Sequence, residues 1–173
     1  MGMSHVQLEY RKQHRKDVLV TPTMQVSAYS TGQVMGGVQT ISSQEEVKLS
    51  DILQSIVVID PSNQGGQIDI FLFNAPTTGT YTDGSAFAPS AADLLACVGV
   101  VNIASADYVA AGSSAKIAGG KNEAMLGRVV KPSTSVPQTT NAASASLYAV
   151  AVARGSLTYA NGLSYRYQFS QGL

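Results

Sequence analysis

Short runs of alternating apolar and polar residues, separated by glycine, proline, asparagine and serine, set the strongest limit on the fold of this chain. Alternation with a period of two indicates β-strands, and no stretch of helical length shows the period of about 3.6 residues expected of an amphipathic helix. The runs recur at roughly the 8–12-residue spacing of sandwiches and barrels. We therefore predict an all-β protein of about eight or nine strands, an antiparallel β-sandwich of the jelly-roll type.

Strands are expected at about 52–59 and 67–73 in the middle of the chain, joined by a turn that contains Pro61 and the pair Gly65-Gly66. Further strands are expected at about 98–103 and, in shorter form, within 106–120 and 123–132.

One short helix is expected. Ser90 is followed three residues later by Asp93, a pattern similar to a capping box, and it predicts one or two helical turns just before the strand at 98–103.

Two hairpins are expected from turn signals, one around Ser30-Thr31-Gly32 and one at the C-terminus around Asn161-Gly162. The first strand of the C-terminal hairpin has a face of small residues, which allows another layer to approach closely. That face comprises Leu147, Ala149, Ala151 and Ala153, and the last strand has an apolar face of Tyr165, Tyr167 and Phe169.

The strand "QIDIFLFNAP" is apolar on nearly both faces and yet contains Asp69. A carboxylate in such a strand is costly to bury without a partner. We expect Asp69 to meet an arginine or lysine of another segment or chain, where a charge-assisted hydrogen bond fixes the register of the contact. A charge that points inward can also protect a strand edge against indiscriminate pairing. A catalytic role is the least favoured of these alternatives.

Charge is sparse and unevenly placed. Charged residues make up 13% of the 173 residues, against roughly 25% in ordinary soluble domains. Between Val18 and Ala115 the one basic residue is Lys48, whereas most acidic residues lie there; basic residues dominate from Lys116 onward. Such segregation favours self-association or docking on a charged neighbour.

Residues 1–22 are polar and basic, and we predict an N-terminal arm there, followed by a β-sandwich domain at 23–173. The cations of the arm are Arg11, Lys12, Arg15 and Lys16. Because Glu9 and Asp17 partly offset them, a solvated tail or a protein-docking arm is favoured over nucleic-acid binding.

Residues suited to catalysis are scarce. The histidines are His5 and His14, both in the arm, so a Ser/His/Asp or Cys/His set within the sandwich is not expected. The one cysteine, Cys97, lies in an apolar run, where a buried and inert thiol is expected. Clustered cysteine and histidine ligands for zinc are absent from the sequence. The sequence has no Trp, so an aromatic platform for a sugar beside paired carboxylates is not expected.

Two loop sequences resemble ligand-binding motifs, a calcium loop and a phosphate loop, but do not match them. "TYTDGSAF" offers oxygen ligands at Thr82, Asp83 and Ser85, but an Asp-Gly turn is favoured over a calcium loop. "AGSSAKIAGGKN" fails the spacing of a phosphate loop, since Ala115 stands where glycine is needed and Asn122 follows Lys121. We expect no cofactor, no metal and no enzymatic activity.

The N-terminus shows no apolar core of signal-peptide length, and no run approaches the roughly 20 apolar residues of a membrane span. We expect a protein that is made in a reducing cytosol and has no membrane partner.

Most of the chain from about Met24 to the C-terminus resembles a group of small structural proteins of tailed bacteriophages. The pieces that carry the resemblance, in order, are "AYSTGQVMGG", "LQSIVVID", "IDIFLFNAPTTGTYTDGSAFAPSAADLLACVGVV" and "LYAVAVARGSLTYA". Some members of this group are similar to capsid decoration, or cement, proteins. The N-terminal arm does not take part in the resemblance.

The resemblance implies a non-enzymatic virion protein, made in the cytoplasm of a bacterial host, that binds the outer capsid surface and clamps neighbouring major capsid subunits. For a protein of this kind we expect a homo-oligomer, a dimer or a trimer at a symmetry axis. We also expect residues 1–22, which the resemblance does not cover, to act as a capsid-docking arm through Arg11, Lys12, Arg15 and Lys16. Two alternatives stay open: a tail or head-tail adaptor component, and a carbohydrate-binding jelly-roll module.

Overall fold

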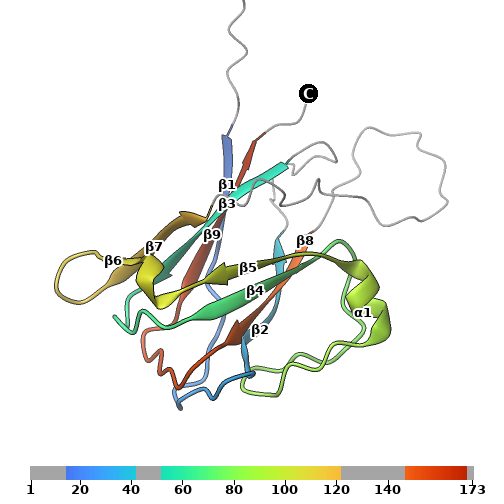
Figure 1. Ribbon diagram of the computed structural model, residues 1–173, viewed down its shortest axis with the longest axis horizontal. Helices are drawn as coiled ribbons and strands as arrows, with labels where there is room; N and C mark the ends of the chain where they lie inside the picture. Colours follow the sequence, from blue (N-terminus) through green and yellow to red (C-terminus); the bar gives the residue numbers. More distant parts are fainter. Residues whose placement is uncertain (1–14, 42–51, 122–146, 171–173) are drawn as a thin grey trace, which may run out of the picture.

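The computed structural model of the chain describes residues 15–41, 52–121 and 147–170, and these residues form two antiparallel β-sheets (Figure 1). The predicted all-β fold is thereby confirmed at the level of class. The strands are β1 (Arg15–Val20), β2 (Val34–Ile41), β3 (Ile52–Asp60), β4 (Ile68–Phe73), β5 (Cys97–Ile103), β6 (Tyr108–Ala110), β7 (Lys116–Lys121), β8 (Leu147–Ala153) and β9 (Ser164–Ser170). The helical elements are α1 (Ala91–Ala96) and the single 3₁₀ turn η1 (Ser105–Asp107).

The chain passes repeatedly from one sheet to the other. One sheet has the order β1-β9-β3-β7-β6, and the second has the order β2-β8-β4-β5. Strands that neighbour each other in a sheet are therefore mostly far apart in the sequence, as the mixed colours within each sheet show (Figure 1).

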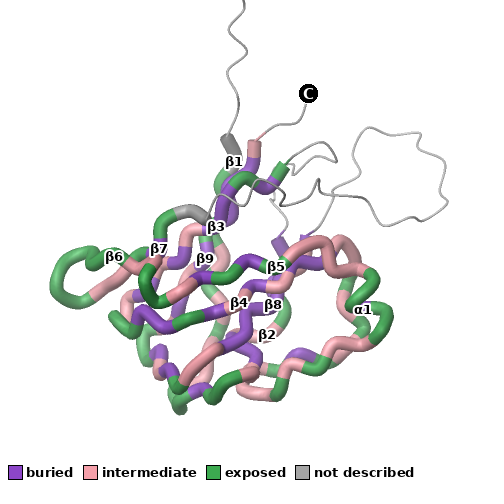
Figure 2. The backbone as a smooth tube through the Cα atoms, in the orientation of Figure 1, coloured by how far each residue is buried: buried purple, intermediate pink, exposed green. Residues whose placement is uncertain are grey.

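The main core lies between the two sheets, where buried residues from both inner faces meet (Figure 2). Tyr165, Tyr167 and Phe169 of β9 enter this core from the five-stranded sheet, and Ala149 and Ala151 of β8 enter it from the four-stranded sheet. Small side chains on one layer leave room for large rings on the other, so that the interior can be filled without a void. The predicted inward faces of these two strands are confirmed.

The prediction that β8 and β9 form a hairpin is wrong, because the two strands lie in different sheets. Asn161-Gly162 does form a turn, in which Gly162 has φ +71° and its N–H donates to the Tyr159 carbonyl oxygen at 2.8 Å. This turn belongs to a connection between the sheets. Tyr159 and Leu163 are buried in the core, and their burial draws the chain from one layer to the other.

The hairpin expected around Ser30-Thr31-Gly32 is also absent from the described residues. Tyr29 forms an isolated bridge to Leu157, and β2 pairs with β8 instead of with the segment before it. Local alternation favours a strand, but the partner of that strand is decided by burial against distant residues.

The predicted arm overlaps the sheet. β1 (Arg15–Val20) pairs antiparallel with β9, and Val18 and Val20 pack against the main core. The sheet therefore begins before the predicted domain boundary at residue 22, because the alternation in "VLV" supplies an apolar face that the core can bury. The remainder of the arm, residues 1–14, lies outside the described residues.

The other predicted elements at 52–59, 67–73 and 98–103 are confirmed as β3, β4 and β5. Segment 106–120 contains β6 and most of β7, whereas 123–132 lies outside the described residues. The predicted capping box is confirmed at the start of α1, where Ser90 is the N-cap and Asp93 is its partner. None of the helices in the described part of the chain has the length and apolar character needed to cross a bilayer.

Gly36 is expected to be far less tolerant of alanine than Gly32. Both have positive φ, but a Cβ at Gly36 would lie 2.5 Å from Pro22 Cβ, whereas a Cβ at Gly32 would meet nothing within 4 Å. We expect Gly36→Ala to lower the free energy of unfolding by about 3 kcal/mol, as strain and overlap add, and Gly32→Ala by about 1 kcal/mol through strain alone. Equal losses in urea unfolding would contradict the close approach of Pro22.

Candidate functional site

The outer face of the four-stranded sheet is partly covered by its own chain. Phe73 of β4 is buried there beneath Tyr81, and the Phe71 and Phe87 rings lie with their centroids 4.3 Å apart. The Tyr81 and Phe87 rings stack with centroids 5.4 Å apart. The segment between β4 and α1 thus forms a second, smaller core on this face, which leaves less of the sheet free for a ligand.

Asp93 holds this covering segment in place. Its carboxylate is 1% exposed and accepts hydrogen bonds from the Thr78 N–H at 2.6 Å, the Tyr81 hydroxyl at 2.8 Å and the Ser90 N–H at 3.1 Å. Burial by itself would raise the pKa of Asp93, but the hydrogen bonds from Thr78, Tyr81 and Ser90 outweigh it and hold the pKa well below the ordinary value. Asp93 is therefore an ionised structural group and not a proton donor.

Asp83 joins three segments of the chain in a similar way. It accepts hydrogen bonds from the Gln25 N–H at 2.6 Å, the Tyr29 hydroxyl at 2.7 Å and the Gly36 N–H at 2.6 Å. Burial, together with this bond to Asp83, raises the pKa of Tyr29 above its ordinary value. The turn expected at Asp83-Gly84 is confirmed, and Asp83 directs its oxygen atoms at protein donors.

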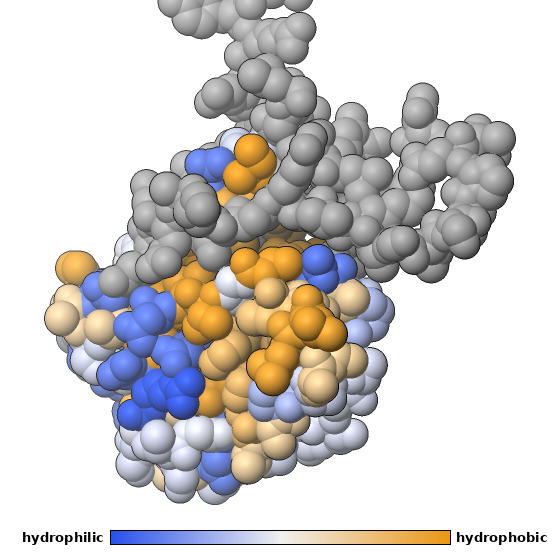
Figure 3. Space-filling view, turned by 45° about the vertical axis from the view of Figure 1, so that its right-hand side comes forward, coloured by the Kyte–Doolittle hydropathy of each residue, from blue (hydrophilic) through white to orange (hydrophobic). Residues whose placement is uncertain are grey.

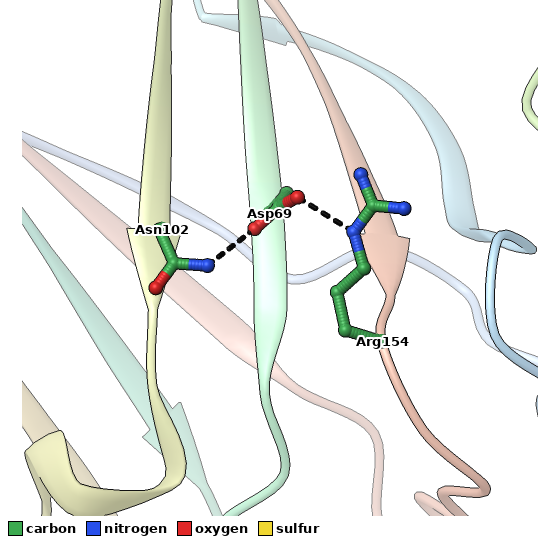
Figure 4. Close-up of polar contacts among 3 residues, drawn as sticks. All are labelled: Asp69, Asn102 and Arg154. Atoms are coloured by element: carbon green, nitrogen blue, oxygen red, sulfur yellow. Dashed lines mark hydrogen bonds and ion pairs between the residues drawn. The ribbon is translucent and has the colours of Figure 1, made fainter.

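Asp69 finds the partner that the sequence led us to expect, within the same chain. Its Oδ2 accepts a hydrogen bond from Arg154 Nε at 2.6 Å, and its Oδ1 accepts one from Asn102 Nδ2 at 2.6 Å (Figure 4). Arg154 lies just past the end of β8 and Asn102 lies on β5, so the carboxylate on the central strand β4 links the strands on both sides. Its role is therefore in register, as predicted.

The Asp69–Arg154 pair is expected to contribute about 1 kcal/mol to the free energy of unfolding. The side chains are 15% and 32% exposed, so solvent screens the pair only in part. A double-mutant cycle of Asp69→Asn and Arg154→Met, followed by urea unfolding, measures the coupling. We expect the coupling to fall at high salt. A coupling of zero at low salt would contradict the role of the pair in register.

The described aspartates that are buried or half-buried are committed to structural contacts. Asp60 is fully buried and accepts hydrogen bonds from the N–H groups of Ser62 at 2.9 Å and Gly65 at 2.7 Å. Within the described ranges, no group of three or more potential metal-ligating side chains comes together. The predicted burial of Cys97 is only partly met: the thiol is half-buried and lies 3.6 Å from the Gly99 carbonyl oxygen.

Of the four cations predicted for the docking arm, the structure describes only two. Arg15 and Lys16 are the first residues of β1, and their backbone is paired with Ser170 and Phe169 of β9. Arg11 and Lys12 lie outside the described residues, as do His5 and His14.

An exposed apolar surface that the sequence analysis missed lies on the outer face of the five-stranded sheet. In the strand register, Ile117 of β7 stands between Val109 of β6 and Ile59 of β3. Leu19 of β1 and Val57 of β3 flank Arg166 of β9 in the same way. We call these six residues the outer apolar row. Leu19, Val109 and Ile117 are 55%, 68% and 37% exposed.

The run "SIVVID" contained the signal for this surface. Ile56 and Val58 point into the main core, which leaves Val57 and Ile59 on the opposite face of β3. A strand with apolar side chains on both faces is stabilised when both faces are buried. Another molecule can bury the second face.

A second exposed apolar surface lies over α1 and β5. Leu94 and Leu95 of α1 are 60% and 90% exposed, and Val100 of β5 is 43% exposed. Apolar surface gathers on this side of the molecule, next to a hydrophilic area (Figure 3). Leu94 and Leu95 are adjacent on a helix of six residues, and grouped apolar side chains of this kind are common at protein contacts.

Comparison of the sequence with protein-family models and with curated proteins found no match. Function is therefore inferred from the two apolar surfaces and from the way the carboxylates are used.

Proposed function

We propose that this protein is a non-enzymatic structural component of a virion, which binds the outer surface of a capsid and clamps neighbouring major capsid subunits. The observation that carries the proposal is the outer apolar row, in which five exposed or half-exposed aliphatic side chains lie with Arg166 across the outer face of one sheet. Contiguous apolar surface of this kind marks sites of protein contact. Arg166, which is exposed within the row, suits a carboxylate on the partner.

The hydrogen bonds that hold the loops of the protein in place support the proposal. Asp60 of β3 accepts the Gly65 N–H of the following loop, and Asp93 of α1 accepts the Thr78 N–H of the preceding loop. Asp83, itself in a loop, accepts the Gly36 N–H of β2, so that each loop is tied to a strand or to α1. A protein that acts by contact area benefits from rigid loops, because little conformational entropy is then lost on binding.

We also propose that the two sheets form a jelly roll. With β6 set aside, the strand orders are β1-β9-β3-β7 and β2-β8-β4-β5. The first strand pairs with the last, the second with the second last, and the chain alternates between the sheets along β1 to β4. Pairings of this kind are expected when a long antiparallel hairpin is wrapped into two Greek keys.

The role of the basic arm is part of the same proposal. Arg11, Lys12, Arg15 and Lys16 would meet acidic surface on the major capsid protein, and copies of the chain would associate as dimers or trimers on the particle. Multiple copies on a symmetric lattice would add avidity to a modest individual affinity.

Binding to capsids that lack the protein tests the proposal. Val109→Lys and Ile117→Lys change the outer apolar row, and Val26→Lys is a matched control because Val26 is 80% exposed and lies outside the row. We expect the two row variants to lower capsid affinity at least about tenfold and the control to leave it unchanged. Unchanged occupancy for both row variants would exclude this face as the docking surface.

Deletion of residues 1–14 tests the arm separately. The deletion leaves β1 in place, so a loss of capsid occupancy would report the contribution of the arm and not the loss of an edge strand. Occupancy equal to that of the full chain would remove Arg11 and Lys12 from the proposed docking contacts.

A further inference from the structure

The two sheets end in four edge strands, and three of these edges are protected. An unprotected edge presents unpaired N–H and C=O groups to any passing strand. β1 begins with the charged residues Arg15, Lys16 and Asp17, and β6 spans only three residues. Charge and short length are both features that discourage pairing between molecules.

The third edge, β2, is occupied by the chain itself. The Val34 N–H donates to the Ser85 carbonyl oxygen at 2.8 Å, and the Gly84 N–H donates to the Val34 carbonyl oxygen at 2.8 Å. A bulge between Met35 and Val38 further interrupts this strand.

The fourth edge, β5, has none of these protections over most of its length. It ends the four-stranded sheet, and no backbone partner lies on its outer side among the described residues. Its sequence, "CVGVVNI", contains no charge. One bulge occurs near its start, but from Gly99 to Ile103 the strand keeps an unbroken register with β4.

Exposed apolar side chains lie along the same edge. Val100 projects from β5, and Leu94 and Leu95 project from the helix that leads directly into it. Between Ala91 and Ile103 the one charged residue is Asp93, which is 1% exposed. The edge and the surface beside it are therefore apolar and, at the surface, uncharged.

We propose that β5 pairs antiparallel with β5 of a second copy of this chain. In such a pair a two-fold axis relates the two β5 strands, so a charged residue on β5 would lie near the same charge on the partner strand. β5 has no charged residue, so this repulsion does not arise. The two four-stranded sheets then become one continuous sheet. Because the strands run antiparallel, α1 of each copy, with Leu94 and Leu95, lies toward the end of the partner's β5, while Val100 lies near the middle of the seam.

A strand pair by itself makes a small contact, so a stable self-association of this type needs side chains beside the strands. A specific interface buries roughly 1,000 Å² or more in total, and a strand pair reaches such an area only with the side chains beside it. Two copies of Leu94, Leu95 and Val100 supply those side chains. The outer apolar row lies on the other sheet, so it stays free to bind a capsid. The proposal does not rest on capsid binding, because it concerns the isolated protein.

Sedimentation of the purified full chain tests this pairing. We expect the wild-type protein to be a dimer, and we expect Val100→Lys and Leu95→Lys each to raise the dissociation constant at least about tenfold, since each contact occurs twice across a two-fold axis. Val109→Lys is the matched control: it is also an exposed valine on an edge strand, but of the other sheet, and it should leave the dimer intact. Leu95, at 90% exposed, gives a variant that does not disturb the packing of the chain.

Three outcomes would overturn the pairing. The first is a monomeric wild-type protein at micromolar concentration. The second is a dimer that both Val100→Lys and Leu95→Lys leave unchanged. The third is a dimer that Val109→Lys weakens as strongly as Val100→Lys does.

Discussion

Replacement of Asp93 by asparagine is expected to lower the free energy of unfolding by about 3 kcal/mol at neutral pH. The carboxylate accepts hydrogen bonds from two segments: from the N–H groups of Thr78 and Gly79 and the hydroxyl of Tyr81 in one, and from the N–H group of Ser90 in the other. An amide keeps one acceptor oxygen and turns an NH₂ group toward donors, so buried N–H and O–H groups lose their partners. Urea unfolding of Asp93→Asn and the wild type measures the difference, and Asp69→Asn, on a more exposed carboxylate, serves as the comparison with the smaller loss.

The loss of unfolding free energy caused by Asp93→Asn is also expected to depend on pH. The folded-state pKa of Asp93 is below its ordinary value, so the stabilisation is complete above the unfolded pKa of about 3.9 and declines as the pH falls toward the folded value. The gap between wild type and Asp93→Asn should therefore be constant from pH 7 to about pH 5 and become smaller below about pH 4. A gap that stays constant down to pH 2, or one below about 1 kcal/mol at pH 7, would contradict the account of this carboxylate.

Replacement of Tyr167 by alanine is expected to lower the free energy of unfolding by about 4 kcal/mol. Tyr167 is fully buried between the sheets, and its hydroxyl donates to Gln39 Oε1 of β2 at 2.9 Å. Its ring therefore fills the core from the five-stranded sheet while its hydroxyl bonds to the four-stranded sheet. Alanine would leave a cavity that the small side chains of β8 cannot fill.

Tyr167→Phe separates the contribution of the ring to the free energy of unfolding from that of the hydroxyl. It keeps the packing and removes one hydrogen bond, so we expect a loss of about 1 kcal/mol. If the phenylalanine variant were as unstable as the alanine variant, the hydrogen bond and not the ring would join the sheets. If both lost less than about 1 kcal/mol, the interior would have to collapse around the missing ring.

Strand positions could be predicted from the sequence because alternation and turn residues act locally. The capping box at Ser90 and the inward faces of β8 and β9 were predictable for the same reason. Strand partners were not predictable, since β8 and β9 are joined by a turn that resembles a hairpin turn and yet lie in different sheets. Pairing is decided by which faces can be buried together, and that depends on residues far apart in the chain.

The residues of the candidate functional site could also be predicted only in part. A partner for Asp69 could be expected from the cost of burying a lone charge, but its identity as Arg154 depends on the pairing of β4 with β8. The outer apolar row joins residues from five strands, and only the register of those strands brings Leu19 and Val109 onto one face. The strand β1, which starts at Arg15 inside the range predicted for the arm, was not predicted, because the charged residues at its start concealed the alternation.

The number of copies in a purified particle, measured by quantitative gel densitometry against the major capsid protein, tests most directly whether this protein works by contact area. A protein that decorates a capsid lattice should be present in numbers on the order of hundreds per particle, because each copy contributes only a modest affinity. About a dozen copies, as expected of a ring at a single vertex, would contradict the account and indicate an adaptor or tail component.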